Sequence, residues 1–321
     1  MSVMLTNKEP VQLSEVFFRD GLQAFESEDL TELGTSTKVE VLERLLEAGV
    51  TDMEVTSFSH PGVVPQFKDA EQVVRSLPEE CLTNGVARAL VPNRVGLGRA
   101  IRAGLRHVTA FLTCSEAYQA KNVGMSIDEA LAEIEEMHRI ATDEGLRMSA
   151  DVGCAFVCPF EGRIDQTVVH RVVGALADIG IHEITVADTL GMADPGSVYS
   201  LFKELGAAHP KVQYGAHLHN RHGVASIGVL AAIDAGVRKI DGALLGVGAG
   251  TIMPVDKFTM GNVPSEEVVY VLNSLGYKTG LEFDVVRSLA RDVAKRISAV
   301  PYPRLMLHGS EEDYIREMRL A

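Results

Sequence analysis

The stretch GIHEITVAD, residues 180–188, shows the pattern that decides the fold of this chain. A glycine follows a segment with helical periodicity, and an aliphatic residue, a mostly polar pair and a β-rich run come after it. Glycine suits the position just beyond a helix end, where the backbone often takes a positive φ before a strand begins. The same pattern recurs at Gly49, Gly104, Gly145 and Gly236, so the sequence predicts repeated helix-to-strand joints.

Strands and helical stretches alternate along most of the chain without a composition break or a linker. This alternation predicts a (β/α)8 TIM barrel over about residues 10–280, with additional C-terminal helices over about residues 281–321. We expect one catalytic domain over residues 1–321. A doubly wound sheet is the alternative, but its first turn should be glycine-rich, and Gly21 stands alone there. The expected strands are 12–17, 52–55, 86–91, 107–112, 148–152, 183–187, 213–217 and 239–245.

Composition narrows the class of protein. Apolar residues make up 46% and charged residues 23% of the 321 residues, which is typical of a soluble globular enzyme. The formal net charge of -14, without a Lys/Arg cluster, argues against a nucleic-acid partner. No segment has the length of a signal peptide core or of a membrane span, so we expect no membrane partner and a cytoplasmic location.

The cysteines do not predict a disulfide framework. Four cysteines at irregular spacings are too few for one in a chain of this length, so we expect reduced thiols. Cys154 and Cys158 have the spacing of a metal-binding pair, but without a second pair they are better interpreted as buried wall residues.

Polar residues gather where the predicted strands end. In a TIM barrel the chemistry lies at the carboxyl ends of the strands, so these side chains should meet at one mouth. The stretch FFRDGLQAFE, residues 17–26, sets an arginine beside an aspartate at the first strand end. The expected mouth residues are Arg19, Asp20, Glu54, Asp188, Thr189, His217, His219 and Asn262.

The H-x-H pair at the seventh strand end is the strongest single signal. His217 and His219 alternate with Leu218, and the two-residue period of a strand points both imidazoles to the same side. Two imidazole nitrogens, with Asp20 and Asn262 as oxygen ligands, are typical of a divalent cation site. This interpretation is favoured over two structural histidines in the core. Mg²⁺ or Mn²⁺ is expected, and Co²⁺ or Zn²⁺ would also suit these donors.

These features make the chain resemble the metal-dependent carbon–carbon lyases and synthases whose barrels begin with an arginine–aspartate pair. Within that group it is most similar to the hydroxymethylglutaryl-CoA lyases. RDG and HxH are shared with the condensing synthases, such as isopropylmalate synthase, whereas the stretches around residues 57–66 and 158–162 are similar to the lyases alone. The resemblance rests on RDGLQ (19–23), TSFSHPGVVPQFKD (56–69), KNVGMSIDEA (121–130), CPFEGRI (158–164), DTLGMADPG (188–196) and GN (261–262).

The resemblance implies an activity and a role for each matching position. It implies cleavage of a 3-hydroxy-3-substituted acyl-CoA into acetyl-CoA and a keto acid, in a homodimer. The metal ligands would be Asp20, His217, His219 and Asn262, and Arg19 would stabilise the enolate oxygen. Further expected residues are Glu54, Asp188 and His217 in catalysis, Gln23, Lys121, Asn122 and Thr189 in substrate binding, and Glu15 and Glu266 as a supporting shell.

One departure from that family concerns the proton donor. Hydroxymethylglutaryl-CoA lyases have a catalytic cysteine in the loop after the eighth strand, and Gly250 stands at the corresponding position. His222, His60 and Thr251 are the nearest candidates for a replacement acid. Otherwise the enzyme would perform a related cleavage on a different 3-hydroxy acid. A condensing synthase of the same family, or a non-catalytic barrel that binds metal and acyl-CoA, is an alternative to the lyase.

Overall fold

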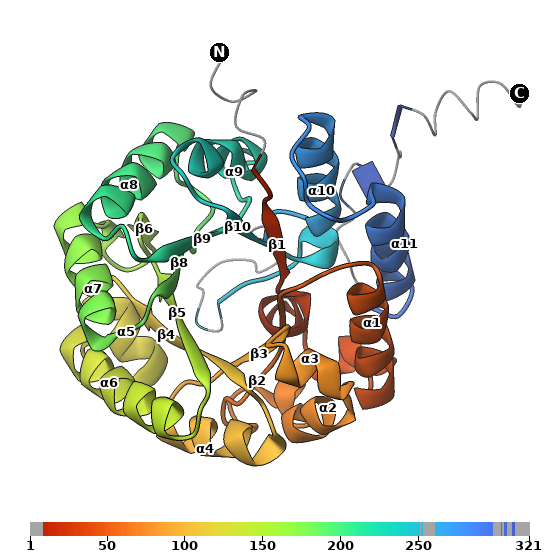
Figure 1. Ribbon diagram of the computed structural model, residues 1–321, viewed down its shortest axis with the longest axis horizontal. Helices are drawn as coiled ribbons and strands as arrows, with labels where there is room; N and C mark the ends of the chain where they lie inside the picture. Colours follow the sequence, from red (N-terminus) through yellow and green to blue (C-terminus); the bar gives the residue numbers. More distant parts are fainter. Residues whose placement is uncertain are drawn as a thin grey trace, which may run out of the picture.

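The computed structural model describes residues 9–250, 252, 261–297 and the isolated positions 303, 305, 306, 310 and 311. Its parallel strands close into a barrel in the order β1-β10-β9-β8-β5-β4-β3-β2 (Figure 1). The predicted TIM barrel and all of its predicted strands are thereby confirmed. The barrel strands are β1 Gln12–Glu15, β2 Met53–Ser57, β3 Ala87–Leu90, β4 His107–Thr113, β5 Arg147–Gly153, β8 Glu183–Asp188, β9 Gln213–Leu218 and β10 Lys239–Gly242.

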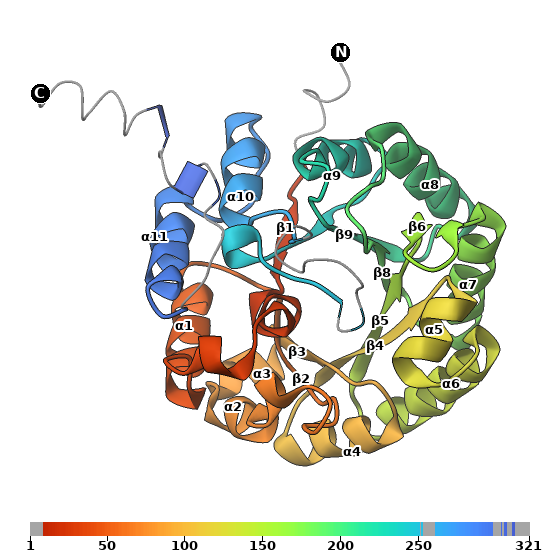
Figure 2. The ribbon, with the colours of Figure 1, turned by 180° about the vertical axis from the view of Figure 1, so that it is seen from behind.

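Helices surround the barrel as an outer ring, which both views show (Figures 1 and 2). The predicted C-terminal tail begins as the helix α11, and the tail beyond residue 297 lies mostly outside the described residues. Within the described ranges, no helix has both the length and the apolar character that a membrane span needs. The helices are α1 Thr35–Glu47, α2 Ala70–Ser76, α3 Glu79–Thr83, α4 Arg94–Ala103, α5 Glu116–Val123, α6 Ile127–Asp143, α7 Gln166–Ile179, α8 Pro195–Ala208, α9 Ala225–Asp234, α10 Ser265–Ser274 and α11 Phe283–Ala294.

The helix-to-strand joints form as the glycine pattern predicts. All of the joint glycines have a positive φ, from 70° at Gly145 to 112° at Gly236. A capping box is present at the start of α6, where the Ser126 hydroxyl accepts from the Glu129 amide and the Glu129 carboxylate accepts from the Ser126 amide. These local signals set the spacing of the strands around the barrel.

Two strands, β1 and β10, end two or three residues earlier than predicted, and both interruptions lie at the mouth. After β1, the amides of Arg19, Asp20 and Gly21 all donate to the carbonyl of Val16, which bends the chain into a π-helical turn over Phe17–Gly21. After β10, the chain forms a short 3₁₀ turn over Leu244–Gly246. A small antiparallel hairpin that was not predicted, β6 Val157–Cys158 with β7 Gly162–Arg163, follows β5.

A guanidinium group fills the barrel interior below the mouth. Arg88 on β3 donates from Nε to Asp52 at 2.8 Å and from Nη2 to Ser14 at 3.0 Å. Its Nη1 donates to Thr109 at 3.0 Å and pairs with Glu54 at 3.1 Å. The barrel interior around Arg88 is therefore polar.

Candidate active site

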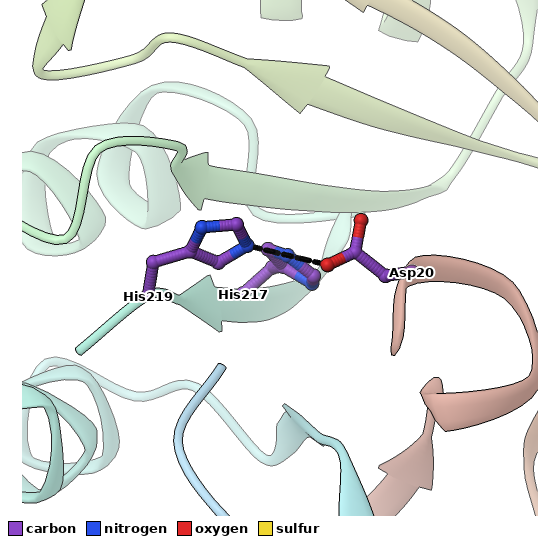
Figure 3. Close-up of side chains that lie close together, drawn as sticks. All are labelled: Asp20, His217 and His219. Atoms are coloured by element: carbon purple, nitrogen blue, oxygen red, sulfur yellow. Dashed lines mark hydrogen bonds and ion pairs between the residues drawn. The ribbon is translucent and has the colours of Figure 1, made fainter. Parts of the chain in front are cut away.

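Three predicted ligands meet at the mouth. His217 and His219 both point inward from the end of β9, and Asp20 faces them from the turn after β1 (Figure 3). The two Nε2 atoms lie 3.1 Å apart, and Oδ2 of Asp20 lies 3.3 Å from Nε2 of His219 and 3.9 Å from Nε2 of His217. All three side chains are buried. One atom from each lies within 4.8 Å of the others, so this group is able to hold one metal ion.

The neighbours of His217 leave its Nε2 atom available to bind a cation. Its Nδ1 lies 3.1 Å from Oδ2 of the buried Asp241 on β10, which favours the tautomer that carries a proton on Nδ1. The Nε2 lone pair is then directed at Asp20 and His219. Burial by itself lowers the pKa of His217, but the hydrogen bond to Asp241 and the charge of Asp20 outweigh it and raise the pKa.

Asn262 and Gly248 complete the fit for a cation. The Asn262 amide nitrogen donates to Asp20 at 2.8 Å, while its Oδ1 is buried without a partner in the described part of the chain. A methyl group at Gly248, where φ is 151°, would collide with the Asn262 amide and the Asp20 carboxylate. The site therefore has two imidazole nitrogens, a carboxylate, a spare amide oxygen and a glycine that leaves room beside them.

Arg19 borders the same cluster and is held by carboxylates. Its Nε donates to Glu54, its Nη1 donates to Asp20 at 2.6 Å, and its Nη2 lies 3.6 Å from Asp151. Burial opposes the charge of Arg19, but Glu54, Asp20 and Asp151 raise its pKa, so the guanidinium stays cationic. Burial likewise opposes the charge of Asp20, yet Arg19 and the two imidazoles hold its pKa well below the usual range.

A cavity of about 270 Å³ opens above these groups. Its lining includes the polar side chains of Arg19, Asp20 and both histidines. It also includes apolar side chains, among them Val64, Leu90, Pro92, Phe111, Val123 and Met125. A ligand with a charged or hydroxylated group and an apolar body would suit this mixed lining.

The expected substrate-binding residues divide into two groups. Gln23, Asn122 and Thr189 line the cavity, and Gln23 also donates to Asp20 at 3.2 Å. Lys121 is not among the lining residues, since its ammonium lies over the ring of Phe160, 5.0 Å from the centroid.

The candidates for a replacement acid are not equivalent. His60 and Gly250 line the cavity, and His60 lies at its exposed rim. His222 is exposed and does not line the cavity, so the geometry gives it no contact with a substrate there. Thr251 lies outside the described residues.

Glu54 and Asp188 occupy positions beneath the cavity. Glu54 is fully buried between Arg19 and Arg88 and is not among the residues that line the cavity. Asp188, at the end of β8, accepts from the Ala193 amide at 2.8 Å, and its Oδ1 has no partner among the described residues. Burial raises the pKa of Asp188, which makes it a stronger base than an ordinary aspartate.

Glu15 and Glu266 hold the backbone around the mouth. Glu15 accepts from the amides of Phe17 and Leu244 and from the Ser265 hydroxyl, and Glu266 accepts from the Leu245 amide. Burial raises the pKa of Glu15 to about 7 and that of Glu266 to about 8. They therefore connect the two turns that interrupt β1 and β10, as a supporting shell would.

The sequence reasoning missed several buried polar residues of the site. Arg88, Asp151 and Asp241 each lie on the inner face of a barrel strand, and Tyr118 lines the cavity from α5. The strand alternation around residues 88, 151 and 241 was a signal that these side chains face the axis. Cys154 and Cys158, by contrast, are free and buried as expected.

Comparison with known proteins agrees with this geometry. The HMGL-like family model matches residues 10–293. A hydroxymethylglutaryl-CoA lyase of Pseudomonas mevalonii is 34% identical over 90% of this chain and 92% of its own length. An (R)-citramalyl-CoA lyase of Chloroflexus aurantiacus is 35% identical over 93% of this chain and 94% of its own length.

A solved structure extends the likeness to three dimensions. An HMG-CoA lyase from Acinetobacter baumannii, in complex with coenzyme A and 3-methylmalate, superimposes with a TM-score of 0.87 at 28% identity. The match covers 95% of this chain and 96% of that one. The chain therefore belongs to the HMGL-like family of carbon–carbon lyases.

Proposed function

We propose that the protein is a divalent-metal-dependent lyase that cleaves a 3-hydroxy-3-substituted acyl-CoA into acetyl-CoA and a keto acid. The observation that carries the proposal is the meeting of Asp20, His217 and His219 beside the Arg19 guanidinium, at the floor of one cavity. The related lyases are named for hydroxymethylglutaryl-CoA and citramalyl-CoA, and the Acinetobacter structure contains coenzyme A with 3-methylmalate. Both named substrates have a tertiary hydroxyl β to the thioester.

The ligand set would hold Mg²⁺ or Mn²⁺, with Co²⁺ and Zn²⁺ as further candidates. Asp20, His217, His219 and the Asn262 oxygen would bind it. When bound, a divalent cation polarises a substrate hydroxyl and lowers its pKa. His217 contributes as a ligand that Asp241 orients, because its Nε2 cannot bind a cation and accept a proton in the same step.

Asp188 and Arg19 have separate roles, the first in proton transfer and the second in stabilising negative charge. Asp188 is not among the residues that line the cavity, so it would take the hydroxyl proton through a water; burial raises its pKa, and its Oδ1 has no partner among the described residues. As the carbon–carbon bond breaks, the electron pair moves onto the thioester, and Arg19 donates to the developing enolate oxygen. Gln23, Asn122 and Thr189 orient the acyl chain on the cavity wall.

The test is cleavage of hydroxymethylglutaryl-CoA and (R)-citramalyl-CoA, followed by mass spectrometry of acetyl-CoA and the keto acid. We expect turnover of at least one substrate, its loss on chelation, and its return with added Mn²⁺. Asp20→Asn and His217→Ala should lose bound metal and activity together. Asp143→Asn, an exposed ion-pair partner of Arg139 on α6, is the control that should keep both.

Three other results would contradict the proposal. Undiminished turnover after chelation would exclude the metal role. Consumption of acetyl-CoA with a keto acid, in place of release, would indicate a synthase. Tight acyl-CoA binding without any product would indicate a non-catalytic barrel. The expected homodimer and cytoplasmic location remain predictions.

A further inference from the structure

The proposed cleavage requires a proton donor that the preceding steps do not supply. Breaking the bond between C2 and C3 leaves an enolate, and its C2 must gain a proton to become the methyl group of acetyl-CoA. Gly250 has no side chain to supply it, and His222 does not line the cavity. The inference below therefore rests on the proposed function and asks which group in the cavity is placed to act.

Asp151 on β5 has the geometry of such a group. Its side chain lines the cavity, is 5% exposed as a residue, and has Oδ2 3.6 Å from Nη2 of Arg19. Neither carboxylate oxygen accepts a hydrogen bond from any residue within the described ranges. Asp20 and Glu54, the other carboxylates that contact Arg19, both have hydrogen-bonded oxygens. Asp151 is thus a buried, unsatisfied carboxyl group beside the guanidinium that would hold the enolate oxygen.

The charges around Asp151 favour its protonated form. Burial is the largest influence on its pKa, and the nearby carboxylates of Glu54 and Asp241 act in the same direction. Arg88 and Arg19 oppose them, and together these influences place the pKa of Asp151 at about 6. A general acid works best when its pKa lies near the operating pH, and an ordinary aspartate would be almost fully ionised there.

The competing acids in the cavity are less suited. Tyr118 also lines the cavity, but burial raises the pKa of its phenol far above the usual range, which makes it a weaker acid. His60 lies at the exposed rim, where its Nδ1 accepts from the Gly62 amide. Asp151 is the candidate that is buried, adjacent to Arg19 and acidic.

We propose that the protonated Asp151 carboxyl is the acid that delivers a proton to C2 of the enolate. The Asp151 O–H bond breaks, a C2–H bond forms, and the enolate electron pair becomes that bond as the thioester carbonyl is restored. Acetyl-CoA leaves, and Asp151 remains as a carboxylate. The proton that Asp188 took from the substrate hydroxyl returns through solvent, so the cycle balances without an oxidant or reductant.

The experiment compares wild type, Asp151→Asn and Asp151→Glu, all loaded with Mn²⁺. Cleavage of hydroxymethylglutaryl-CoA and (R)-citramalyl-CoA is measured as a function of pH. Exchange of the acetyl-CoA methyl protons with D₂O is followed by NMR, since exchange requires the same group to remove and return a proton at C2. Circular dichroism and metal content show whether each variant keeps its fold and its cation.

We expect kcat of Asp151→Asn to fall by about 10²- to 10⁴-fold with a much smaller change in KM, and methyl exchange to fall in parallel. The wild-type rate should decrease at high pH as the acid ionises, and this decrease should be absent from the residual activity of Asp151→Asn. Asp151→Glu should recover part of the rate. Tyr118→Phe, which removes the competing hydroxyl, should lose less than Asp151→Asn.

The outcomes separate the two proposals. If wild type cleaves a substrate and folded Asp151→Asn keeps kcat within threefold, the role of Asp151 is overturned while the lyase stands. If wild type exchanges the methyl protons and Asp151→Asn does not, but neither substrate is cleaved, Asp151 is supported and the cleavage proposal fails. A wild type that neither cleaves nor exchanges overturns both.

Discussion

Two arginines contact the buried Glu54 carboxylate, Arg88 from β3 below the mouth and Arg19 from the turn at the mouth, and they differ in how completely they are bonded. Each of the three guanidinium nitrogens of Arg88 has a partner between 2.8 and 3.1 Å, and the residue is 1% exposed. Arg19 has close partners on Nε and Nη1, but the contact of its Nη2 with Asp151 is 3.6 Å and the residue borders the cavity.

This difference indicates that Arg88 stabilises the fold and that Arg19 is able to donate to a ligand. Arg88 has a hydrogen bond on each guanidinium nitrogen, and removing it leaves several buried carboxylates without compensation. Arg19, whose Nη2 lies 3.6 Å from Asp151, can offer a donor to charge that develops on a substrate, without first giving up a close bond. The predictions below test that separation, beginning with the largest expected effect.

Replacing the lower arginine should affect folding. Arg88→Met removes the charge that faces Asp52, Glu54 and Asp241, and we expect the free energy of unfolding to fall by roughly 3–5 kcal/mol. Urea denaturation measures this change. Arg139→Met is the matched control, because its pairs with Glu136 and Asp143 are exposed and screened by solvent and should contribute much less than those of Arg88. Equal losses in the two variants would remove the distinction between buried and surface ion pairs.

Replacing the upper arginine should affect turnover. Arg19→Lys keeps the positive charge between Glu54 and Asp20 but loses the planar fork, so we expect kcat to fall by about 10²- to 10³-fold. The free energy of unfolding should change by less than in Arg88→Met. Steady-state kinetics, with metal content measured on the same samples, checks this. A variant within tenfold of wild type would show that the open donor of Arg19 is not used in the reaction.

The sequence predicted much of the region at the mouth, around the two histidines, and little of the region below it, around Arg88. His217 is on β9 and His219 directly follows the last residue of that strand, so their common direction follows from extended-chain geometry. The glycine joints likewise depend on neighbouring residues, and all formed. Arg88 is on β3, and its three carboxylate partners come from β2, from the residue just before β2 and from β10, so only closure of the barrel brings them together.

The contact of Arg19 with Asp151 was unpredictable for the same reason. Arg19 reaches the axis because three amides share the Val16 carbonyl in an unusual turn, and residues 17–21 carry no signal for that geometry. Alternation could place Asp151 on the inner face of β5, but it could not place Arg19 above it. The sequence therefore predicts those parts of the candidate site that a single strand positions. It does not predict contacts between segments that are distant in the sequence.

The two regions should also differ in how their stability depends on pH. Burial alone would raise the pKa of Asp52, but Lys239 and Arg88 outweigh it and hold the pKa well below the usual range. The unfolded chain then binds more protons at low pH, so this contribution to stability is present above about pH 4 and is lost as the pH falls. Around the mouth, burial and then the charge of Glu15 raise the pKa of Glu266 to about 8. There the folded state binds more protons, so stability falls as the pH rises towards 8.

Two variants should each remove one of these opposite pH dependences of the unfolding free energy. Asp52→Asn should flatten the wild-type loss of stability in acid, and Glu266→Gln should flatten the loss between about pH 5 and 8. Each change in slope is limited to about 1.4 kcal/mol per pH unit, since one group binds one proton. Urea unfolding at a series of pH values measures both slopes, and the double variant should show the sum of the two changes. If Glu266→Gln leaves the pH dependence of the unfolding free energy unchanged near neutral pH, burial of Glu266 does not destabilise the folded protein there. The two regions would then differ only in how their arginines are bonded.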